Sequence, residues 1–143
     1  MALFDSQNSI FQINDGGSLR DISPYILSID GLPGAKELLD VTALGASGRA
    51  WSPGLEANIV IALDLWWSDD ASVGPDTVFR LVRALAAATA WDYGPEGKTS
   101  GKQKYSGTCW LKDYRITTNV GAKVRARVEL QVEGTVSPGT YSA

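Results

Sequence analysis

The sequence contains no histidine and only one cysteine, Cys109, among its 143 residues. Without histidine, the chain cannot form a Ser-His-Asp or Cys-His catalytic arrangement, or a metal site with imidazole ligands. A single cysteine also excludes an internal disulfide bond and a cysteine-based structural zinc site. The composition therefore excludes several common classes of hydrolase and metalloprotein, and we expect a protein without a cofactor.

The beginning of the chain has no long apolar run. Its first twelve residues, MALFDSQNSIFQ, include neither a basic region nor a hydrophobic stretch. A signal peptide or transmembrane segment requires such features. We therefore expect a chain that does not insert into a membrane and that is made in the cytoplasm of its host cell.

Size and composition are those of one globular domain. Hydrophobic residues make up 44% of the chain and charged residues 20%, as in ordinary folded proteins. A chain of this length buries roughly two-thirds of its unfolded surface, which is enough to fold without disulfides or metals. We predict a single domain over residues 1–143.

Charge is distributed unevenly along the chain. Residues 1–79 contain eleven acidic and three basic residues, a net charge of −8, whereas residues 80–143 contain five acidic and ten basic residues, a net charge of +5. This asymmetry could bring copies of the chain together, acidic surface against basic surface. Alternatively, the two halves mix within one fold and their fields cancel.

Two segments alternate between apolar and polar positions with the period of two that is typical of a β-strand. Segment 59–67 is apolar at every odd position, and segment 123–133 is apolar at every even position. The odd positions of the second segment are all charged or polar, which predicts a strand with one dry and one wet face. A further strand over 105–116 changes phase near Lys112 and Asp113, which predicts a β-bulge.

Residues 75–89 change to the period of an amphipathic helix. Pro75 suits the first helical turn, and Asp76 complements the helix dipole. Shorter strands are expected over 10–13, 22–29, 36–44 and 91–93. The pattern predicts a mainly β protein with one helix (α+β), built as a β-sandwich or half-barrel with a flanking α-helix.

Three stretches are expected to lie outside this core, an N-terminal arm (1–9), a loop (45–54) and a C-terminal tail (135–143). The loop reads GASGRAWSPG and separates two apolar strands. It places one basic residue, Arg49, and one large aromatic residue, Trp51, where no core is expected. Large aromatic side chains often anchor protein interfaces, so this loop is a candidate contact between subunits.

Three kinds of chemistry find little support in the sequence. Residues 97–99 read GKT, as at the end of a phosphate-binding loop, but Asp92 stands where that motif needs its first glycine. Asp69 and Asp70 could bind a hard cation, yet adjacent acids before a helix usually face solvent. Five tryptophans could form a sugar-binding platform, although most fall on predicted strands.

The sequence around the loop resembles the major tail tube proteins of tailed bacteriophages. A strand ending in VTALG, a glycine-bearing connection and then SPGLEANIVIALDLWW follow the family's VTxxG…PGLxxxxxxL pattern. The resemblance extends from about residue 22 to residue 134 and includes the later segment YSGTCWL. The positions that match the pattern are Val41, Thr42, Gly45, Pro53, Gly54, Leu55 and Leu63.

This resemblance implies a structural, non-enzymatic virion protein with a tail-tube-like fold. Subunits of that family assemble into rings, usually hexameric, which stack into a tube through which DNA passes without sequence-specific binding. The implied partners are therefore copies of the same chain and other tail proteins, and the implied location is the virion tail. Two alternatives remain, a tail terminator or tail-end ring protein, and a carbohydrate-binding β-domain.

The resemblance also directs attention to two sets of residues. The arm and the loop would bridge neighbouring subunits or rings, and acidic side chains would line the lumen. The strand over 123–133 is a candidate for pairing between subunits, although its wet face includes three basic residues, which does not suit an acidic lining. The candidate contacts are Phe4, Arg49, Trp51 and Pro53. The candidate lumen residues are Glu37, Asp40, Glu56 and Asp64.

Overall fold

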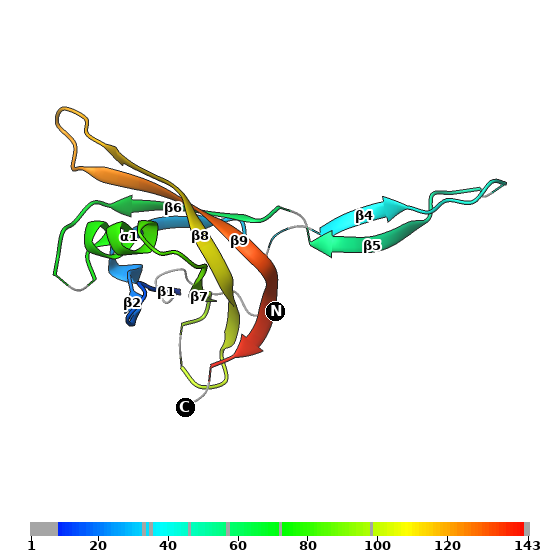
Figure 1. The fold of residues 1–143 in the computed structure, drawn as a ribbon, viewed down its shortest axis with the longest axis horizontal. Coiled ribbons are helices and arrows are strands. Elements are labelled where there is room, and N and C mark those ends of the chain that lie inside the picture. Colours follow the sequence, from blue (N-terminus) through cyan, green and yellow to red (C-terminus); the bar gives the residue numbers. More distant parts are fainter. Residues whose placement is uncertain are drawn as a thin grey trace.

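The computed structural model describes residues 9–141 except positions 33, 35, 46, 57, 72 and 98, and excludes the side chains of 36, 37 and 54–56. The described residues form nine β-strands, one α-helix and one short 3-10 helix (Figure 1). In chain order the elements are β1 (Ile10–Asn14), β2 (Leu19–Asp21), η2 (Ser23–Tyr25), β3 (Ile26–Asp30), β4 (Lys36–Asp40), β5 (Trp51–Glu56), β6 (Val60–Trp66), α1 (Pro75–Arg83), β7 (Thr89–Gly94), β8 (Gln103–Thr117) and β9 (Arg125–Thr140).

Seven strands form one antiparallel sheet in the order β2-β1-β7-β8-β9-β6-β3. Strands β2 and β3 are its two edges, yet only residues 22–25 separate them in the chain. A flat sheet of seven strands would be about 29 Å wide, whereas five Cα–Cα steps reach at most about 19 Å. The sheet must therefore curl until its edges approach each other, which produces the half-barrel seen in Figure 1.

The hydrophobic core lies inside this curl. Phe11 on β1 stacks on Trp91 of β7 with ring centroids 6.2 Å apart. Helix α1 contributes Val78 and Phe79, and the Phe79 ring lies 6.0 Å from that of Tyr114 on β8. Residues from both ends of the sheet thus meet one face of a single helix, as predicted for a half-barrel with a flanking helix.

The strands with the clearest alternation behave as their sequences predict. On β6 the side chains of Ile61, Leu63 and Leu65 are fully buried, while the residues between them are partly exposed. On β9 the even positions from 126 to 132 are buried and the odd ones are not. The predicted bulge in β8 is present, because the β8–β9 register shifts between Leu111 and Asp113.

The helix is shorter than its sequence predicts. It ends at Arg83 rather than at residue 89, and its last turn tightens where the Ala84 N–H bonds to the Leu81 carbonyl at 3.2 Å. Thr89 begins β7 instead, pairs with Cys109 and donates a hydrogen bond to the Asn14 carbonyl at 2.5 Å. Pairing on both sides of β7 outweighs the weak local preference of the alanine run for helix.

Two of the predicted extensions are strand over part of their length. Residues 51–54 of the predicted loop belong to β5, and residues 135–140 of the predicted tail belong to β9. The tail pairs with the start of β8, and the Tyr141 N–H bonds to the Lys102 carbonyl at 3.0 Å. Backbone pairing needs no apolar side chain, so polar composition alone was a poor guide to this segment.

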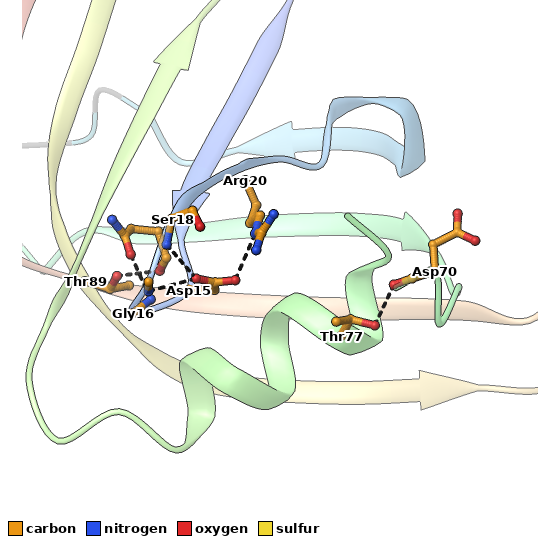
Figure 2. Close-up of polar contacts among 9 residues, drawn as sticks. Asp15, Gly16, Ser18, Arg20, Asp70, Thr77 and Thr89 are labelled. Atoms are coloured by element: carbon orange, nitrogen blue, oxygen red, sulfur yellow. Dashed lines mark hydrogen bonds and ion pairs between the residues drawn. The ribbon is translucent and has the colours of Figure 1, made fainter. Parts of the chain in front are cut away.

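The turn between β1 and β2 is held by a carboxylate (Figure 2). Asp15 is buried, and its side chain accepts hydrogen bonds from the N–H groups of Gly17 at 2.9 Å and Ser18 at 3.0 Å. Arg20 Nε lies 3.0 Å from the other carboxylate oxygen. Burial acts to raise the pKa of Asp15, but the bonds from Ser18, Gly17 and Arg20 together lower it. The turn is therefore a structural element that depends on an ionised carboxylate.

The acidic turn before α1 folds back onto the start of the helix. Thr77 Oγ1 donates a hydrogen bond to the Asp70 carbonyl at 2.6 Å (Figure 2), and the Tyr25 hydroxyl donates to the Asp70 carboxylate. Within the described ranges, no three histidine, cysteine, aspartate or glutamate residues gather as metal ligands do. In the same part of the chain, no helix has the length and apolarity needed to cross a membrane.

Candidate assembly surfaces

Strands β4 and β5 form a separate two-stranded hairpin that projects from the half-barrel (Figure 1). Leu39 pairs with Ser52 and Asp40 pairs with Trp51. The hairpin continues beyond these strands, since the Val41 N–H bonds to the Ala50 carbonyl at 3.0 Å. A two-stranded hairpin is at best marginally stable alone in water, so its projection into solvent calls for an explanation.

The hairpin exposes large apolar side chains on both of its faces. Residues that pair directly across a hairpin share a face, and successive residues alternate. One face therefore contains Leu38 (57% exposed) and Trp51 (56% exposed), and the other contains Leu39 (49%) and Val41 (55%). We call these the Trp51 face and the Leu39 face. Such a contiguous exposed apolar surface is typical of an interaction site.

Polar contacts close the Trp51 face near the hairpin tip. The Asp40 carboxylate accepts hydrogen bonds from the Thr42 N–H at 3.0 Å and the Thr42 hydroxyl at 2.6 Å. Its second oxygen lies 2.6 Å from Arg49 Nη1. The Thr42 hydroxyl oxygen also accepts from the Ala50 N–H at 2.8 Å, so it joins both strands. This Asp40 clasp orders the tip without any buried core.

The Asp40 clasp predicts an acid-resistant carboxylate. The Thr42 side chain, then the Thr42 backbone and then Arg49 lower the pKa of Asp40 below its ordinary 3.8. A depressed pKa means that the clasp persists above 3.8 and is lost only as the pH falls below that value. A carboxyl-carbon NMR titration is expected to show this low midpoint. Thr42→Val should raise the midpoint more than Arg49→Ala, and the reverse order would contradict the assignment.

The candidate residues from the sequence fall into two groups. Arg49, Trp51 and Pro53 lie together on the Trp51 face, and Asp40 pairs with Arg49 there. Asp40 was expected to line a lumen, but the structure places it in the same hairpin as the candidate contacts. Two further lumen candidates lie on the backbone of β4 and β5, although their side chains are outside the described part. These are Glu37 and Glu56; Phe4, in the arm, also lies outside the described residues.

Asp64 lies apart from the hairpin, on the outer face of β6. Its carboxylate accepts hydrogen bonds from Ser28 of β3 at 3.0 Å and from Arg127 of β9 at 3.0 Å. Arg125, the next outward base on β9, lies over the Trp66 ring at 5.0 Å. Two of the bases on the wet face of β9 are therefore matched by neighbours on β6, rather than standing unopposed.

The sequence missed Leu38 and Leu39 as exposed residues. They are adjacent, so in a strand they must point to opposite faces. A strand covered on one side cannot bury both, and they precede a glycine-bearing stretch. This local breach of the alternating pattern was the available signal for a hairpin that needs cover on two sides.

Comparison with solved structures identifies the fold. The SPP1 tail tube matches with a TM-score of 0.75 at 13% identity, covering 99% of this chain and 81% of that chain. The tail of an empty gene transfer agent (GTA) particle, determined with C6 symmetry, matches with a TM-score of 0.71 at 13% identity, covering 99% and 100%. The tube-terminating cap of the anti-feeding prophage matches with a TM-score of 0.68 at 10% identity, covering 98% and 93%.

The likeness lies in the fold rather than in the sequence. No protein-family model matches the sequence, and no curated protein matches it either. The structural matches nevertheless cover almost the whole chain, including a mainly β architecture with one helix. The chain therefore has the fold of phage tail tube proteins.

Proposed function

We propose that the chain is a non-enzymatic structural subunit of a phage or phage-like tail, which assembles with copies of itself into stacked rings of six and encloses a channel for DNA. The observation that carries the proposal is the projecting hairpin, with apolar side chains exposed on both faces, in a chain that shares the fold of tail tube proteins. In a virion tail, such a surface would be covered by neighbouring subunits.

In a closed ring, strand pairing between subunits would remove exposed sheet edges. The strand over 123–133 was the predicted candidate, but β9 pairs with β6 and β8 at once from Arg125 to Gln131. Both of its edges are occupied there. The pairing of β7 with β8 stops at Cys109, although β8 continues to Thr117. We propose this stretch of β8 as the ring-forming edge.

Asp64 and its neighbours are our proposed lumen surface, since they lie on the face of the sheet opposite the core. The ion pair between Asp64 and Arg127 would lower the net charge of that surface. DNA would then pass a surface of matched charges without strong binding. The arm that contains Phe4 and the end of the tail remain proposed contacts between rings.

A terminator is the second candidate, because the match to a tube-terminating cap covers 98% of this chain. A terminator would form one ring and no tube. A carbohydrate-binding role has less support, since Trp91 is fully buried and Trp67 packs against the core. Those two side chains are not available for a sugar-binding platform.

Negative-stain electron microscopy of the purified chain over increasing concentration tests the proposal. We expect rings with six-fold averages that stack into tubes as the concentration rises. Single rings at every concentration would favour the terminator. A chain that stays monomeric under crowded conditions would contradict both roles.

A further inference from the structure

The two apolar faces of the hairpin point in opposite directions, and the hairpin contacts little else in its own chain. We propose that in the assembled state the hairpin lies between two other copies of this chain, one covering the Trp51 face and the other covering the Leu39 face. This inference rests on the proposed function and adds the number of partners that each hairpin binds.

The Trp51 face has the composition of an interface anchor. Trp51 and Leu38 lie side by side across the pair of strands, with Pro53 opposite Leu38. The charges nearest to them, Asp40 and Arg49, neutralise each other 2.6 Å apart. An ordered tip with an exposed aromatic residue and no net local charge suits an apolar pocket on a neighbour.

The Leu39 face is separate and also requires cover. Leu39 and Val41 are about half exposed, and Ser52 and Ala50 lie opposite them. Alternate side chains of a strand stand on opposite sides of the pleat, so a single flat partner surface cannot cover both faces. If only one copy bound, the other apolar face would remain in water.

The shape of the molecule favours copies of the same chain as the two partners. Figure 1 shows the β4–β5 hairpin and the β8–β9 turn projecting at opposite ends. The β8–β9 end also exposes apolar side chains, Ile116 and Val120. Two different sticky ends on one chain produce a head-to-tail contact, which repeats from copy to copy. Each hairpin then meets more than one neighbour as the assembly grows.

Photo-crosslinking counts the partners directly. A photoreactive benzoylphenylalanine is placed at Trp51 alone, at Leu39 alone, or at both positions of one chain. Each labelled chain is mixed as a small minority with unlabelled wild-type chain, assembled, irradiated and separated on a denaturing gel. We expect covalent dimers from each single label and covalent trimers from the double label.

The outcomes separate this inference from the proposed function. Dimers alone from the double label, with both single labels active, would show that one copy covers both faces, and would overturn the two-partner inference while leaving assembly intact. Absence of rings and of crosslinks in every sample would overturn the proposed function as well. A second pair of labels, at Leu38 and Val41, repeats the test on the same two faces, and circular dichroism confirms that each labelled chain is folded.

Discussion

Val128→Asp is expected to leave no folded protein. Val128 is fully buried on β9, in the part of that strand that pairs on both sides. The substitution removes an apolar side chain from the core, about 2 kcal/mol, and adds an unpaired carboxylate that must either ionise or shift its pKa at a further cost of several kcal/mol. The sum is comparable with the roughly 5–15 kcal/mol that stabilises a typical domain.

Thr135→Asp is the matched control, because it introduces the same residue into the same strand at an exposed position. Thermal denaturation followed by circular dichroism should show a cooperative transition for Thr135→Asp close to that of the wild type, and none for Val128→Asp. A folded Val128→Asp variant would mean that the even positions of β9 do not face the core.

Leu38→Ser combined with Trp51→Ser is expected to abolish assembly while leaving the domain folded. Both side chains are more than half exposed on the Trp51 face, so their loss should change the free energy of unfolding by less than about 1 kcal/mol. In the assembled state, each would bury apolar surface against a neighbour. Losing two such anchors costs about 3 kcal/mol or more per contact, which raises the concentration needed for assembly more than about a hundredfold.

Sedimentation velocity and electron microscopy at matched concentrations measure this effect. Leu81→Ser is the control, since Leu81 on α1 is similarly exposed but lies outside the hairpin. We expect the control to assemble like the wild type. Tubes formed equally well by the double variant would exclude the Trp51 face as a contact, and a lowered melting temperature would show that it supports the monomer instead.

The candidate site was only partly predictable. Arg49, Trp51 and Pro53 stood out because a basic and an aromatic residue occurred among glycines with no core in reach. The link between Asp40 and Arg49 did not, because the two residues are nine positions apart and meet only when β4 and β5 pair. A lumen role had been expected for Asp40, yet its nearest partners belong to the hairpin.

By itself, the sequence determined the elements whose signals are local. The alternation in β6 and β9, the proline at the start of α1 and the phase change in β8 each depend on neighbouring residues, and each appears in the structure. The burial of side chains follows from such patterns, because period two and period 3.6 place residues on defined faces whatever lies beyond them.

Only the tertiary structure decided where elements end and which surfaces remain open. Helix α1 stops at Arg83 because β7 takes Thr89 into the sheet, and β9 reaches Thr140 because β8 offers it a backbone partner. The curl of the sheet follows from a short connection between its two edges, and the hairpin projects because no part of the described chain covers it. These outcomes depend on hydrogen bonds and packing between distant segments, for which the local sequence holds no signal.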